Sequence, residues 1–163
     1  MRLIAITLPE MTPGEDERIV SMLSSHTFWR VHIRKPDTSA GSLRQLLDHL
    51  PTWCHPQLVL HDHFELCHHY TLGGIHLNHR NPDIPHDLTD ALSSAHHSAA
   101  VGQSRPSFTV SCSCHSFDEV RERKAAMDYL FLSPIFDSIS KRGYLSQFSI
   151  ESLQNAAEEG LID

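Results

Sequence analysis

Residues 128–144 read DYLFLSPIFDSISKRGY, a short strand followed by a polar loop. Tyr129 to Leu132 is an apolar run of strand length, and Pro134 ends it because proline has no amide hydrogen for a neighbouring strand. The loop then carries the polar side chains Asp137, Ser138, Ser140, Lys141 and Arg142. Hydroxyls and cations after a strand can hold a phosphate or pyrophosphate. A solvated surface loop explains this stretch equally well when it is taken alone.

Outward from this stretch, short apolar runs alternate with helical patterns along the whole chain. We expect strands at 3–7, 28–34, 57–61, 75–78, 107–113 and 129–132, and helices at 15–24, 39–50, 62–70, 88–100, 116–126 and 149–159. Continuously apolar strands that alternate with helices are typical of a parallel sheet covered by helices. The sequence therefore predicts an α/β fold with about six βα units in a single domain, residues 1–163. An open doubly wound sheet and part of a (β/α)8 TIM barrel both fit, and a complete barrel usually needs at least ~200 residues.

Composition narrows the classes of partner. Thirteen Lys and Arg against twenty Asp and Glu give a net charge of −7, so we expect no nucleic-acid partner. The longest apolar runs are too short for a membrane span, and the N-terminus lacks a signal-peptide pattern. The four cysteines show no disulfide-framework spacing, which favours a reducing, cytoplasmic location. The spacing of cysteines and histidines does not favour zinc either.

Polar side chains follow five of the expected strands at the point where each strand ends. These strand-end residues are His32, Arg34, Lys35, His61, Asp62, His63, His76, Asn78, His79, Ser113, Cys114, His115, Ser138, Ser140 and Lys141. In parallel α/β folds the functional site lies beyond the carboxyl ends of the strands. The cations Arg34, Lys35 and Lys141 suit a polyanionic ligand, and Asp62 suits Mg²⁺. We therefore expect a phosphate-ligand site here.

These segments resemble the thiamine-phosphate synthase family, together with its thiazole tautomerase (TenI-like) branch. VHIRKPD (31–37) resembles the family's Gln-x-Arg-x-Lys strand end, and LVLHD (58–62) resembles its Ile-Asn-Asp-Arg stretch. Residues 74–77, GIHL, match its Gly-Val-His-Leu, and Ser113-x-His115 matches its Ser-x-His. The segment 133–141, SPIFDSISK, resembles its Gly-Pro-Ile-Phe-x-Thr-x-Thr-Lys and is the most specific match.

The resemblance implies a (β/α)8 barrel enzyme, a transferase that joins a pyrimidine pyrophosphate to a thiazole phosphate with Mg²⁺ and releases pyrophosphate. It implies that Asp62 helps to hold Mg²⁺ and that Arg34 faces the pyrophosphate. The other substrate-binding positions that it implies are His32, Lys35, His61, His79, Ser113, Ser138, Ser140 and Lys141. Catalytic roles fall to Arg34 and Lys141, and in the tautomerase branch to His115, which would move a proton on the thiazole.

Several positions depart from the family pattern. His32 replaces its Gln, His61 its Asn, and Asn81 stands where it has a metal-binding Asp, with Asp83 two residues later. One carboxylate in place of two should hold Mg²⁺ less well. The last two βα units of the family are missing, so we expect a C-terminally incomplete domain whose open sheet edges a homo-oligomer could cover. The leading expectation is the synthase reaction; a tautomerase and a non-catalytic phosphate-ligand-binding protein are the alternatives.

Overall fold

The computed structural model describes residues 2–89, 108–137 and 145–162. The chain divides into two compact units, residues 1–110 and 111–163, and each is described by itself. The expectation of a single domain over residues 1–163 therefore stays a prediction.

The first unit contains four parallel strands connected by helices. Its elements are β1 (Leu3–Ile6), α1 (Glu15–Ser24), β2 (Phe28–Ile33), α2 (Ala40–His49), η1 (His55–Gln57), β3 (Leu58–Leu60), η2 (Phe64–His68) and β4 (Gly74–Leu77), where η marks 3-10 helices. The pairs β1·β2, β2·β3 and β3·β4 are all parallel. The next strand, β5 (Thr109–Cys114), begins in this unit, where the Thr109 amide donates to the Gly73 carbonyl at 3.0 Å.

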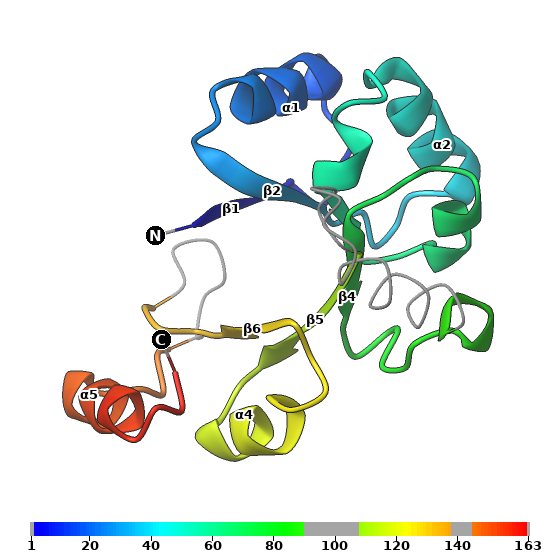
Figure 1. The fold of residues 1–163 in the computed structure, drawn as a ribbon. Coiled ribbons are helices and arrows are strands. Elements are labelled where there is room, and N and C mark those ends of the chain that lie inside the picture. Colours follow the sequence, from blue (N-terminus) through cyan, green and yellow to red (C-terminus); the bar gives the residue numbers. More distant parts are fainter. Residues whose placement is uncertain (1, 90–107, 138–144, 163) are drawn as a thin grey trace, which may run out of the picture. The chain divides into compact units, whose positions relative to one another are not determined.

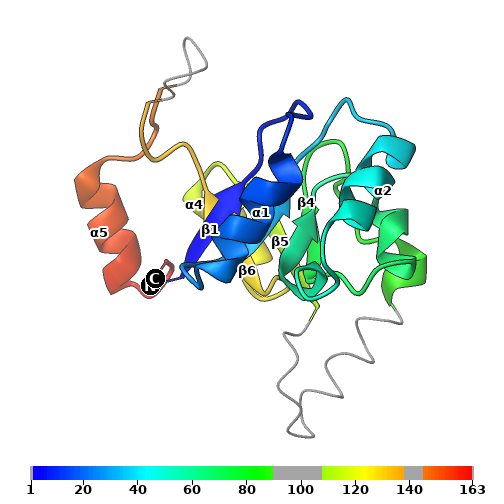
Figure 2. The ribbon, with the colours of Figure 1, turned by 90° about the horizontal axis from the view of Figure 1, so that it is seen from above.

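The helices of this unit lie on one face of its strands. Figure 1 shows α1 and α2 outside the strands, and the view from above in Figure 2 agrees that α1 covers β1. The buried apolar residues of α1 are Ile19 and Leu23, and β2 offers the buried side chains of Val31 and Ile33. Because side chains alternate along a strand, Arg30 and His32 then face the opposite side of β2. The strands therefore have an apolar face that the helices cover and an opposite face with polar side chains. The candidate site lies on this polar face.

The second unit contains the rest of β5, α4 (Phe117–Arg123), β6 (Tyr129–Leu132) and α5 (Ile150–Glu158). β5 and β6 are parallel, with Ser113 opposite Phe131. Each helix begins at a serine that caps it: Ser116 Oγ accepts from the Glu119 amide, and Ser149 Oγ does the same for the amide three residues on. Both caps satisfy amides that the first helical turn leaves without partners.

The fold class predicted from the sequence is confirmed: the chain has an α/β fold of the (β/α)8-barrel type with about six βα units. The helix at 15–24 and the strand at 129–132 have the expected bounds. The helix expected at 62–70 is wrong, because His63 adopts a left-handed φ of 57° and only a short 3-10 helix follows. Most of the helix expected at 88–100 lies outside the described residues. No described helix has both the length and the apolar character of a membrane span.

Candidate functional site

Three histidines from neighbouring strands meet in the interior of the first unit. His32 lies in β2, His61 directly follows β3, and His76 lies in β4. The strand register brings them together, since His32 pairs with Val59, and the pairing of Leu60 with Ile75 places His61 beside His76. Their exposed fractions are 0%, 4% and 1%. We call these three residues the histidine cluster.

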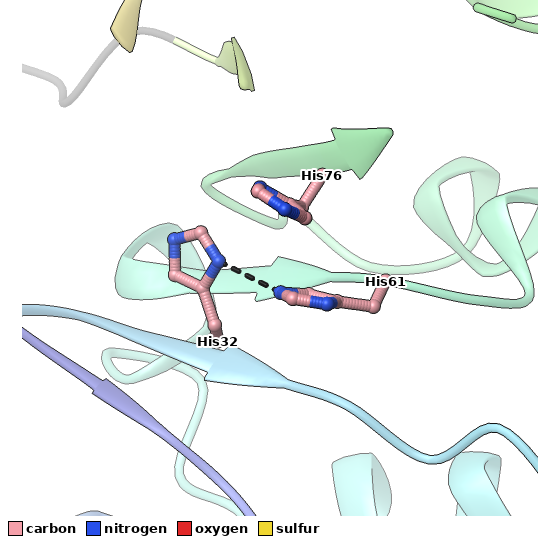
Figure 3. Close-up of side chains that lie close together, drawn as sticks. All are labelled: His32, His61 and His76. Carbon is pink, nitrogen blue, oxygen red and sulfur yellow. Dashed lines mark hydrogen bonds between the residues drawn. The ribbon is translucent and has the colours of Figure 1, made fainter. Parts of the chain in front are cut away.

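The rings of the histidine cluster touch one another (Figure 3). His32 Nδ1 and His61 Nε2 are 2.9 Å apart and share a hydrogen bond, in which one nitrogen carries the proton and the other accepts it. The His61 and His76 rings are stacked with centroids 4.2 Å apart, and His32 meets His76 edge-on at 5.3 Å. One nitrogen from each ring lies within 4.8 Å of those of the other two.

Burial keeps the rings of the cluster uncharged at neutral pH. It lowers the pKa of His32 to about 3, with smaller contributions from the neighbouring His76 ring and the Arg30 guanidinium. Burial also lowers the pKa of His76 to about 4. A buried imidazolium is unfavourable because the interior solvates charge poorly. Each neutral ring therefore keeps one nitrogen lone pair.

Of the three rings, His61 has the most strongly lowered pKa. Burial lowers its pKa to about 2, and the His76 and His32 rings act in the same direction. The guanidinium groups of Arg34 and Arg80 also disfavour a positive charge on this ring. His61 is therefore the ring of the cluster that is least able to take up a proton.

The carboxylate of Asp62 is held by two neighbours rather than left open to a ligand. Arg80 donates to it through Nε at 3.0 Å to Oδ1 and through Nη2 at 2.9 Å to Oδ1 and 3.1 Å to Oδ2. Asn81 Nδ2 donates to the same Oδ1 at 3.1 Å. This chelating guanidinium geometry is among the strongest arrangements for an arginine–carboxylate pair.

The donor set around Asp62 does not fit Mg²⁺. Both Asp62 oxygens accept from a cationic guanidinium, which would repel a second cation in the same place. Within the described part of the chain, no grouping of three carboxylate, thiol or imidazole ligands includes Asp62. Mg²⁺ requires oxygen ligands in near-octahedral geometry, commonly one or two carboxylates together with substrate phosphates. We derive no chemical step through Mg²⁺.

The ammonium of Lys35 is bonded to other groups of the protein. It is fully buried, and its ammonium donates to Glu15 Oε1 at 2.6 Å and to the carbonyls of Leu8 at 2.8 Å and Glu10 at 2.6 Å. An ammonium has only three hydrogens, so all of its donors are used. We therefore leave Lys35 out of the proposed ligand site.

Arg34 and His79 differ in their setting. Arg34 is half-buried, and its backbone amide donates to Thr7 Oγ1 at 3.0 Å, which holds the chain just after β2. Its guanidinium acts on the His61 ring, so it lies on the side of the histidine cluster. His79 is exposed, as is Asp83. Of these residues, only Arg34 combines a cation with proximity to the buried polar interior.

In the second unit, His115 stands at the end of β5 with its ring held in one orientation. His115 Nδ1 lies 2.8 Å from the Ser133 carbonyl, and because a carbonyl can only accept, Nδ1 carries the proton. Nε2 is then the nitrogen with the lone pair, and the residue is exposed. Glu119 Oε2 accepts from the His115 backbone amide at 2.7 Å, so the cap of α4 also fixes the histidine backbone. Ser113 is half-buried two residues earlier on the strand.

The expected phosphate-loop residues Ser138, Ser140 and Lys141 lie outside the described residues. Arg80 and Glu15, which bind Asp62 and Lys35, were not predicted from the sequence as residues of the site. A basic residue directly after the strand-end stretch 76–79 was the available signal for Arg80. His76 is part of the motif at 74–77, but its contacts with the other two rings depend on the strand register and could not be predicted from the motif.

Comparisons with known proteins agree on one family. The sequence model of the thiamine monophosphate synthase family matches residues 3–162. A solved structure of thiamine phosphate pyrophosphorylase from Bacteroides thetaiotaomicron is similar to the chain, with 36% sequence identity and a TM-score of 0.79. The similarity covers 100% of this chain and 68% of that one. No curated protein sequence matches the chain.

Proposed function

Because the chain belongs to the thiamine monophosphate synthase family, we propose that it acts on a phosphorylated thiazole of thiamine biosynthesis and that His115 moves a proton on the thiazole ring. Family membership supports a function related to thiamine biosynthesis. Proton transfer is the tautomerase reaction, one of the alternatives that the sequence leaves open. We propose it because of how the side chains of this chain are arranged.

The orientation of His115 is the observation that carries this proposal. With Nδ1 donating to the Ser133 carbonyl, the exposed ring presents Nε2 as a base of fixed tautomer. An imidazole can take a proton from one ring atom and return it to another at neutral pH, which is general acid–base catalysis. Such a step moves a proton and a double bond and needs neither a leaving group nor a metal.

The state of Asp62 favours metal-independent chemistry. Arg80 supplies a fixed positive charge beside the carboxylate in place of a divalent ion. We keep Arg34, and separately Ser138, Ser140 and Lys141, as proposed phosphate-binding residues, since guanidinium, ammonium and hydroxyl groups are the usual phosphate partners. His32, His61, His79 and Ser113 stay as proposed contacts to the rest of the ligand.

The synthase reaction is the second candidate. The similar protein from Bacteroides thetaiotaomicron is named a thiamine phosphate pyrophosphorylase, and its 36% identity favours the same reaction here. In that reaction the bond between the pyrimidine's carbon and pyrophosphate breaks, pyrophosphate leaves with the electron pair, and the carbon bonds to the thiazole nitrogen. The departing pyrophosphate needs strong charge compensation. The single, guanidinium-bound carboxylate argues against it in this chain.

Exchange of the mobile thiazole proton with solvent deuterium tests the proposal. The full chain is incubated with thiazole phosphate in deuterated buffer containing chelator, and exchange is followed by NMR. We expect His115→Ala to lower the rate on the order of 10²–10⁴-fold. The matched control is His49→Gln, which changes an exposed histidine of α2. Exchange that survives His115→Ala would refute the assignment of the base.

Pyrophosphate release tests the second candidate in the same samples. With both substrates and Mg²⁺, we expect no release above the level seen with chelator. Release that depends on Mg²⁺ and on Lys141 would favour the synthase reaction instead.

A further inference from the structure

The peptide unit that joins Cys114 to His115 is held on both of its sides. Its carbonyl, from Cys114, accepts a hydrogen bond from the Ser133 amide at 3.0 Å, which continues the pairing of β5 with β6. Its N–H, from His115, donates to Glu119 Oε2 at 2.7 Å. Because a peptide unit is planar, bonds to its two polar groups fix the orientation of the whole plane. The direction in which the His115 side chain leaves the backbone is thereby fixed as well.

The contact between Glu119 and the His115 amide departs from the usual capping box. Ser116 is the N-cap of α4, and its Oγ accepts from the Glu119 amide at 3.1 Å, as the box requires. In the usual box, the carboxylate three residues later accepts from the amide of the N-cap residue itself. Here the Glu119 carboxylate accepts from the amide of the residue before the N-cap. The first turn of α4 is therefore bonded directly to the residue that carries the proposed base.

We propose that Glu119 is a positioning residue for the proton transfer, because its carboxylate holds the backbone from which the imidazole of His115 extends. This inference rests on the proposed function. The Ser133 carbonyl holds the same residue at its ring, since His115 Nδ1 donates to it at 2.8 Å. One contact thus fixes the backbone of His115 and the other fixes its ring. Glu119 acts through His115 and does not itself touch the ligand in this proposal.

Loss of the Glu119 contact should release the peptide unit and let the direction of the ring vary. A general base must lie within hydrogen-bond reach of the proton that it takes, and a misplacement of about 1 Å can cost about 10²-fold in rate. A ring that is no longer held against the Ser133 carbonyl can also adopt either neutral tautomer. We expect Glu119→Ala to lower kcat of the exchange by about 10- to 100-fold and to leave KM for thiazole phosphate unchanged.

Deuterium exchange into thiazole phosphate by the full chain, measured at several substrate concentrations, tests this role because it gives kcat and KM separately. The conservative variant Glu119→Gln keeps an acceptor oxygen of the same reach and should restore most of the rate. The matched control is Asp118→Ala, which removes the neighbouring acid of the same helical turn, whose carboxylate accepts from Arg121. A second readout is the tautomer of His115, followed by nitrogen–proton NMR correlations at a pH where the ring is neutral.

The two readouts separate a positioning role from a purely structural one. A lower kcat, an unchanged KM and mixed His115 tautomers in Glu119→Ala, with wild-type values in Asp118→Ala, support the proposal. A wild-type rate and tautomer in Glu119→Ala, or an equal loss of kcat in Asp118→Ala, overturn it. If Glu119→Ala does not fold, Glu119→Asp takes its place, since its shorter side chain keeps the charge and loses the reach.

The proposed function and the role of Glu119 can fail separately. If the wild-type chain catalyses no exchange, the proposed function fails, and the tautomer of His115 still decides whether Glu119 holds the ring. Mixed tautomers in Glu119→Ala then support the positioning contact, and a single tautomer, as in the wild type, overturns it.

Discussion

Acidification should destabilise this protein through the histidine cluster. In the unfolded chain, His32, His61 and His76 return to the ordinary pKa of 6.5, whereas in the folded chain their pKa values are lowered to about 3, about 2 and about 4. Below about pH 6.5 the unfolded state therefore binds more protons than the folded state. Stability is then fully present above that pH and is lost as the pH falls toward the folded values.

The size of the loss follows from the difference in pKa. Between about pH 7 and about pH 5, each ring of the cluster favours the unfolded state by about 2 kcal/mol. The three rings together lower the free energy of unfolding by about 6 kcal/mol, and the number of protons taken up on unfolding approaches three. A loss of this size is comparable to the whole free energy of unfolding of many domains, which is about 5–15 kcal/mol. The cationic groups near the rings, Arg30, Arg34 and Arg80, act in the same direction.

Urea unfolding at a series of pH values, with chelator present, measures this effect. The double variant His32→Gln/His61→Asn is the matched control, because it removes two of the three titrations while keeping polar side chains of similar size. Its pH dependence should fall to about a third of the wild-type value. A wild-type loss below about 2 kcal/mol, or a variant with unchanged slope, would refute the explanation.

Two substitutions test the packing around the site. Glu15→Ala leaves the Lys35 ammonium buried beside carbonyls alone, and we expect urea unfolding to show a loss of about 3–5 kcal/mol, with Glu17→Ala on the exposed face of the same helix nearly unchanged. Gly73→Ala would place a Cβ against the Pro56 carbonyl, so we expect a lower Tm and a cost of about 1–3 kcal/mol. Equal stability of Glu15→Ala and Glu17→Ala, or a Gly73→Ala chain as stable as wild type, would contradict these contacts.

Local sequence signals predicted much of the fold. The acidic start of the helix at 15–24 and the proline after the strand at 129–132 fixed elements that the structure places as expected. The helix expected at 116–126 also begins where the sequence places it, and the Ser116 hydroxyl accepts from the Glu119 amide there. The helix at 62–70 could not be rejected from the sequence, because nothing in its pattern reveals the left-handed backbone at His63.

The site was harder to predict, because its state depends on residues far apart in the chain. The positions of Asp62 and Lys35 at strand ends were found from the sequence. Whether these two side chains are free to bind a ligand could not be predicted, because Arg80 is 18 residues from Asp62 and Glu15 is 20 residues from Lys35. The sequence pattern does not specify how the segments that carry Arg80 and Glu15 pack against Asp62 and Lys35.

Deuterium exchange into thiazole phosphate by the full chain in chelator is the measurement that tests the central claim most directly. We expect exchange that needs no divalent ion, disappears in His115→Ala and persists in His49→Gln. Exchange that is absent in chelator and restored by Mg²⁺, or that persists in His115→Ala, would contradict it.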